Sequence, residues 1–231
     1  MTETDWLSCC DPTAMLDFLG ERAGGRKLRL FACACCRRIW PMLADERSRK
    51  AVEIAEGYAD GMASGSELGA ARIDAEEAAD ELTSRSIDAG TGPDGPAVSA
   101  AAAAMNAADD RFEADDPEGS APFYAASNAH LAVSDTSPSG ASAELAAQCR
   151  LLRDIVGNPF RPTSLDSSRL AAGVRDLARV MYDRRSFERM PELARALEQA
   201  GCTNEEVLRH CRQEGEHVRG CWVVDIILDR K

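Results

Sequence analysis

Residues 26–40 read RKLRLFACACCRRIW, and this stretch decides the fold. Its large apolar side chains are distributed nearly all round a helix, whereas its basic residues gather at the two ends. A helix that is apolar on most sides is a buried helix. We therefore expect residues 26–40 to form a central helix, packed against a helix over 149–156 and the C-terminal helices, with Pro41 interrupting it.

The rest of the composition indicates further helices. Apolar residues make up 45% of the chain, but aromatic residues only 5%, and alanine, leucine, glutamate and arginine are abundant. These are helix formers, whereas strands favour β-branched and aromatic side chains. We predict an all-α protein, a single domain over residues 1–231 with about eight to ten helices.

Acidic residues are concentrated in the middle of the chain. Residues 51–140 hold 18 Asp and Glu but only three Lys and Arg, out of 39 and 27 in the whole chain. Within this region, residues 88–140 are acidic and rich in Ala, Gly and Pro, so we expect a loosely ordered insertion there. An acidic run is usually a solvated face, and a docking surface for a basic partner is the alternative.

Charge and hydropathy exclude several classes of protein. A net charge of −12 argues against binding to a nucleic-acid backbone, and no apolar run approaches the length of a membrane span. The first residues, MTETDWLSCCDPTAML, lack an export core, so we expect a reducing, cytoplasmic setting in which the nine cysteines are thiols or ligands. No phosphate-binding glycine loop occurs, and no substrate class is indicated, so we expect no catalytic activity.

Three polar residues are predicted to begin helices. Asp11 precedes Pro12, which suits the first helical position, and Ser66 precedes a strongly acidic amphipathic segment. Thr203 stands three residues before Glu206, the spacing of a capping box. The last segment, VRGCWVVDIILDR, is predicted as a short helix, with a strand as the alternative because it is rich in Val and Ile.

Cysteines and histidines offer a candidate metal site. Cys33 and Cys36 share one face of the central helix, while His210-Cys211 and His217-x-x-x-Cys221 place four potential ligands within a dozen residues. Cys33, Cys36, His217 and Cys221 would together form a tetrahedral Cys₃His site suited to zinc. The alternatives are buried structural thiols without any cofactor, or a redox pair in which Arg37 and Arg38 lower the thiolate pKa of Cys36. A nucleophilic triple of Cys221, His217 and Asp225 is a further alternative.

A second candidate surface is the segment NPFRP, residues 158–162. Prolines bias it to an extended form, and Phe160 and Arg161, with Arg219 in HVRGCW, are candidate contacts for a protein partner. The other interpretation is an internal ion pair between Arg161 and the acidic helices. The first functional hypothesis is a non-catalytic protein-interaction module, and the alternative is a zinc-binding or thiol-based protein.

Three phrases carry a resemblance to a known family. RKLRLFACACCRRIW, GNPFRP and GEHVRGCWVVDIIL, with the opening WL…DP…ML, together resemble a family of uncharacterised bacterial helical proteins, a domain of unknown function. The resemblance covers about Asp5–Ala63 and Cys149–Leu228 and leaves out the acidic middle. It implies one composite helical domain, and it implies no activity.

Overall fold

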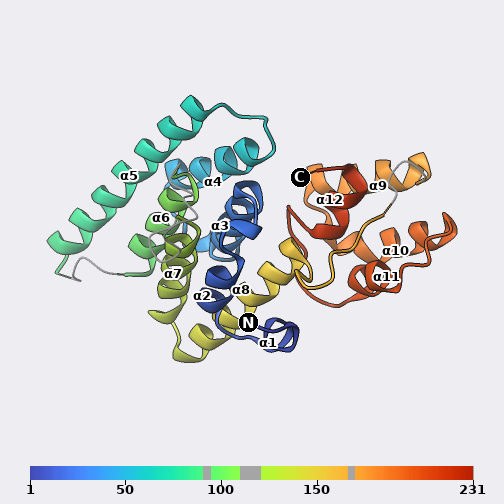
Figure 1. Ribbon diagram of the computed structural model, residues 1–231. Helices are drawn as coiled ribbons and strands as arrows, with labels where there is room; N and C mark the ends of the chain where they lie inside the picture. Colours follow the sequence, from blue (N-terminus) through green and yellow to red (C-terminus); the bar gives the residue numbers. More distant parts are fainter. Residues whose placement is uncertain (91–94, 110–120, 166–169, 231) are drawn as a thin grey trace. The chain divides into compact units, whose positions relative to one another are not determined.

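The computed structural model describes residues 1–90, 95–109, 121–165 and 170–230, and in these ranges the regular structure is helical, with no strand (Figure 1). The all-α prediction is confirmed. The α-helices are α1 (Glu3–Ser8), α2 (Pro12–Leu19), α3 (Gly25–Arg38), α4 (Glu46–Ala59), α5 (Gly65–Asp88), α6 (Pro96–Ala107), α7 (Ala121–Ser134), α8 (Pro138–Val156), α9 (Ala172–Arg184), α10 (Met190–Gln199), α11 (Glu205–Arg212) and α12 (Trp222–Leu228). Short 3₁₀ turns are η1 (Gly20–Arg22), η2 (Trp40–Met42) and η4 (Phe187–Arg189). Twelve α-helices in the described ranges exceed the expected eight to ten; α1, which the sequence did not indicate, has six residues, too few for a clear periodicity.

The chain divides into two compact units. Unit 1 comprises Met1 and Ser8–Cys149, and unit 2 comprises Thr2–Leu7 and Arg150–Lys231, so the division falls inside α8. The single domain expected from the sequence stays a prediction.

Helix α3 is buried in unit 1, as its sequence predicts. Its side chains from Arg29 to Cys36 are all buried, and α3 ends at Arg38, just before the η2 turn that contains Pro41. The helices packed on it include α4, α6 and α7. Two of these, α6 and α7, come from residues 88–140, for which the sequence predicted no role in the core.

The described part of residues 88–140 contains two helices whose packing faces are made of alanine. Ala103, Ala104, Ala125 and Ala129 are each 0% exposed, and α6 and α7 pack against each other. Small side chains bury little area each, but they let two helix backbones approach closely. Residues 91–94 and 110–120 lie outside the described residues, and the looseness expected of this segment stays a prediction.

Helix starts are partly as predicted. Asp11 caps α2, accepting a hydrogen bond from the Thr13 amide. The cap of α5 is Ser64 and not Ser66, because Ser64 stands three residues before Glu67 and forms a reciprocal capping box with it. The cap of α11 is Asn204 and not Thr203, since the Asn204 side chain accepts from two backbone amides.

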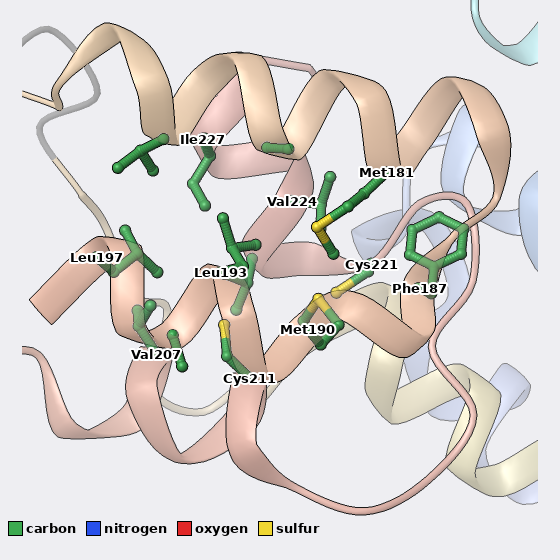
Figure 2. Packing of buried hydrophobic residues seen from close by; sticks show 14 of the residues in the cluster. Met181, Phe187, Met190, Leu193, Leu197, Val207, Cys211, Cys221, Val224 and Ile227 are labelled. Carbon is green, nitrogen blue, oxygen red and sulfur yellow. The ribbon is translucent and has the colours of Figure 1, made fainter.

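The core of unit 2 lies among α9, α10, α11 and α12. Figure 2 shows side chains from each of these helices, and from η4, pointing into one apolar cluster. Cys211 and Cys221 belong to this cluster and are 0% exposed. The C-terminal segment is a helix, so the strand alternative is wrong; its β-branched residues are buried in a helical core, where packing outweighs propensity. In the described residues, no helix combines the length and apolarity needed to cross a membrane.

Candidate functional site

Four side chains of unit 2 that can hold a metal ion come together beside this core. They are Asp154, His210, His217 and Cys221, and one ligand atom from each lies within 4.8 Å of all the others. Asp154 lies on the last turn of α8 and His210 on α11, whereas His217 belongs to the loop that leads to α12, and Cys221 is the residue before that helix. The four residues are all buried or partly buried.

The Asp154 carboxylate is at the centre of the cluster. Its Oδ1 lies 2.6 Å from His217 Nδ1 and 3.1 Å from His210 Nε2, and its Oδ2 accepts a hydrogen bond of 3.0 Å from the Val218 amide. Burial raises the pKa of Asp154, but the hydrogen bonds from His210 and His217 outweigh burial, so its pKa is lowered overall. The carboxylate is therefore ionised although only 5% of it is exposed.

His217 is the charged member of the pair. Its Nδ1 faces the carboxylate, and its Nε2 lies 3.4 Å from the Gln213 carbonyl, so both nitrogens have acceptors as partners. Burial lowers the pKa of His217, but the hydrogen bond and the charge of Asp154 act in the opposite direction and leave the pKa raised. Two acceptors and a raised pKa indicate an imidazolium paired with Asp154.

His210 has a different set of neighbours. Its Nδ1 lies 3.1 Å from Trp222 Nε1, and an indole N–H can only donate, so Nδ1 accepts this hydrogen bond with its lone pair. The proton of the neutral ring is then on Nε2, which faces Asp154 Oδ1 at 3.1 Å and Cys221 Sγ at 3.3 Å. The two histidines, whose ring centroids are 4.9 Å apart, thus have different partners on their second nitrogens, an indole N–H for His210 and a carbonyl for His217.

The Cys221 thiol is held in its protonated form. Burial raises its pKa well above the ordinary value, and the charge of Asp154 raises it further. The nucleophilic triple of Cys221, His217 and Asp225 is opposed by this pKa, and by His217, which pairs with Asp154 instead. Cys221 could become a thiolate if a bound metal ion displaced the proton.

The predicted zinc ligands are divided between the two units. His217 and Cys221 lie in unit 2, where they join Asp154 and His210, whereas Cys33 and Cys36 lie on α3 in unit 1. The Cys33 thiol lies 3.8 Å from the Val52 carbonyl, and burial raises the pKa of Cys36 to about 12 although Arg37 lowers it. The lowered pKa expected for Cys36 in the redox interpretation is therefore opposed by its burial. The four-residue set Cys33, Cys36, His217 and Cys221 itself stays a prediction.

Asp154 is the member of the cluster that the sequence analysis missed. It stands between Leu152 and Ile155, both 0% exposed, so an acid occupies the apolar side of an amphipathic helix. An acid at such a position could have indicated the site, since a buried carboxylate needs hydrogen-bond or charge partners. His210 was recognised as a potential ligand but left out of the predicted set.

The residues proposed for a protein partner are placed as follows. Phe160 is 38% exposed, and the Arg161 side chain is 72% exposed and pairs with Glu3 at 2.8 Å. Among the described residues, the ion pair of Arg161 is made with Glu3 of α1. Arg219 is partly buried, with its guanidinium 5.4 Å from the centre of the Tyr182 ring. Their role in partner binding stays a prediction.

A pocket of about 140 Å³ opens onto the cluster. Its lining includes Asp154, His210, His217 and Trp222, together with arginines from α8 and α11. Comparisons with protein-family models, with curated proteins and with solved structures give no match. The resemblance of the three phrases to a family of bacterial helical proteins therefore stays a prediction, and the site has to be interpreted from its own chemistry.

Proposed function

We propose that unit 2 binds one zinc ion at the cluster of Asp154, His210, His217 and Cys221. The observation that carries the proposal is the convergence of a carboxylate, two imidazoles and a thiol within 4.8 Å of one another. A mixed set of sulfur, nitrogen and oxygen donors suits Zn²⁺.

The distances in the cluster suit an ion after a small adjustment. Zinc bonds of about 2.0–2.3 Å place neighbouring ligand atoms of a tetrahedral site about 3.3–3.7 Å apart. The hydrogen-bonded ligand atoms of the cluster are 2.6, 3.1 and 3.3 Å apart. The closest pair, His217 Nδ1 and Asp154 Oδ1, therefore has to move apart by about 0.7 Å to reach the shorter of these zinc spacings. His217, which belongs to that pair, lies in the loop that precedes α12.

The surroundings of His217 support its role as a ligand. When Nδ1 gives up its proton to bind the metal, Nε2–H still faces the Gln213 carbonyl. A backbone carbonyl on the second nitrogen is the usual way in which proteins orient a metal-bound histidine.

Metal analysis of the full chain tests the proposal. Protein purified without chelator should contain one equivalent of zinc, and Asp154→Asn and Cys221→Ala should remove it. Cys211→Ala is the matched control, because Cys211 is equally buried in the same core but lies outside the cluster. Refilling metal-free protein to about 100 times the dissociation constant should stabilise unit 2 by about 2.7 kcal/mol. Wild-type protein that takes up neither Zn²⁺ nor Co²⁺, or a Cys221→Ala variant that keeps its metal, would overturn the proposal.

We also propose a protein partner for the segment around Phe160, because an aromatic ring 38% exposed stands there beside an exposed guanidinium. A photo-reactive amino acid at position 160 should crosslink one discrete partner in cells. The same probe at Val180, which is equally exposed in unit 2, should not. Identical crosslinks from both positions would exclude a specific site.

A further inference from the structure

We propose that the metal ion has three protein ligands, Asp154, His217 and Cys221, and that its fourth position takes a small oxyanion, a carboxylate or a phosphate. In this arrangement His210 is a hydrogen-bond donor to the anion, and Arg150 and Arg209 complete the anion site. The inference rests on the proposed zinc site and deepens it.

A hydrogen bond from Trp222 orients the His210 ring. Trp222 Nε1 is 3.1 Å from His210 Nδ1 and can only donate, so the lone pair of Nδ1 is occupied and the ring proton is on Nε2. It is Nε2 that faces the cluster, at 3.1 Å from Asp154 Oδ1. A nitrogen that carries a proton cannot bind a metal ion, but it can donate to an anion bound to that ion.

The hydrogen bond between Trp222 and His210 is held in place by the packing of Trp222. For Nε2 to become a ligand, the proton would have to move to Nδ1, where it would face the indole N–H, and Trp222 would have to turn away. The Trp222 ring packs closely on Gly157, since a Cβ built there would lie 3.2 Å from the ring. Only 9% of Trp222 is exposed, so the side chain has little room to move.

Three protein ligands leave one position of a tetrahedral ion for an outside molecule, as zinc sites that bind substrates do. The pocket of about 140 Å³ reaches Asp154, His210 and His217, whereas Cys221 lies outside its lining. The open position is therefore on the pocket side. The pocket is smaller than the roughly 300–1,000 Å³ of sites for larger ligands, so its occupant is a small molecule.

The charges at the pocket favour an anion. Arg150 and Arg209 are exposed and line the pocket, and within the described ranges neither of them has an ion-pair partner. Guanidinium groups match the planar fork of a carboxylate or the oxygens of a phosphate. Two glutamates also line the pocket, but one of them, Glu206, accepts a hydrogen bond from Thr163.

Cobalt-loaded protein gives the test, because its visible spectrum reports the coordination sphere directly. Adding inorganic phosphate or acetate should change the spectrum saturably. Arg150→Gln and Arg209→Gln should each weaken anion binding about tenfold, the expected effect of one lost charged hydrogen bond. Arg179→Gln on α9, away from the pocket lining, is the control.

Variants of His210 and Trp222 separate a donor from a ligand. His210→Ala should still bind one equivalent of cobalt but lose the response to anions, and His210→Gln, which keeps a donor, should recover part of it. Trp222→Phe keeps a ring but releases Nδ1, so His210 can become the fourth ligand and the anion response should fall.

The outcomes distinguish this inference from the zinc site itself. Failure of the wild-type protein to bind metal would refute the proposed function. Bound metal whose spectrum ignores both anions, together with loss of metal in His210→Ala, would make His210 a fourth ligand and overturn only the anion site. If the anion response is unchanged in Trp222→Phe, the indole N–H does not keep the proton on His210 Nε2, and the assignment of His210 as a donor is refuted.

Discussion

Gly157 is the position where one added methyl group tests the arrangement around Trp222. Its φ is +78°, a backbone conformation that L side chains rarely adopt, and Trp6 Nε1 donates to its carbonyl at 3.1 Å. In Gly157→Ala the new Cβ would also lie 3.2, 3.3 and 3.4 Å from three atoms of the Trp222 ring. The substitution therefore combines backbone strain with a steric clash.

A second glycine separates these two effects. Gly201 has a φ of +85°, but an added Cβ there meets nothing within 4 Å. Gly201→Ala should cost about 1–2 kcal/mol of unfolding free energy through the left-handed backbone alone. Gly157→Ala should cost a further 1–3 kcal/mol or so, the usual penalty of overpacking.

Urea unfolding measures the difference. Trp6 and Trp222 lie in unit 2 and Trp40 in unit 1, so in a Trp40→Phe background the fluorescence reports unit 2 alone. With a urea m value of about 1–3 kcal/mol/M, an extra 2 kcal/mol lowers the midpoint by about 1 M. Equal losses in Gly157→Ala and Gly201→Ala would refute the close packing of Trp222 on Gly157, and with it the rigidity assigned to the His210 hydrogen bond.

Three further perturbations have expected outcomes. Arg29→Met should lower the unfolding free energy of unit 1 by about 3 kcal/mol in thermal melts, because the buried guanidinium donates to two carbonyls at the end of α6 at 2.7 and 3.1 Å. Arg29→Lys should lose less of this free energy. Ala129→Leu should cost about 1–3 kcal/mol in the same melts, since Ala129 is 0% exposed, whereas Leu131→Ala on the outside of α7 should change little. In metal-free protein His217 has a raised pKa and Asp154 a lowered one, so the stability that their ion pair contributes is complete between pH 3.8 and 6.5, the ordinary pKa values of the two groups. It should be lost as pH rises through the folded pKa of His217 or falls through that of Asp154, and urea midpoints of Asp154→Asn should show neither loss.

The sequence predicts the buried state of α3 but not all of what covers it. Because apolar side chains lie all round residues 26–40, the sequence predicts that other helices cover this helix, and α3 is buried as expected. Alanines such as Ala104 and Ala129 signal helix but bury little area each, so nothing in their pattern indicates that α6 and α7 pack closely on α3. Packing of small residues depends on how closely two backbones approach, which is a property of the folded chain.

The candidate site could be predicted only in part for a similar reason. His217 and Cys221 stand close in sequence, and spacing identified them, as it did His210 as a potential ligand. Asp154 is 56 residues before His210, and only its place among buried leucine and isoleucine side chains indicated it. Pairings across such a distance depend on tertiary packing and not on local periodicity.

The number of metal ligands is the feature furthest from the sequence. His210 and His217 are chemically the same side chain, yet one has an indole N–H on its second nitrogen and the other a carbonyl oxygen. The carbonyl leaves the cluster-facing nitrogen of His217 able to offer a lone pair, and the indole keeps a proton on that of His210. Spacing identifies both histidines as potential ligands, whereas the partners of their second nitrogens separate the proposed ligand, His217, from the proposed donor, His210. The proposed three-ligand site with an open position therefore depends on Trp222, which is not itself one of the proposed ligands.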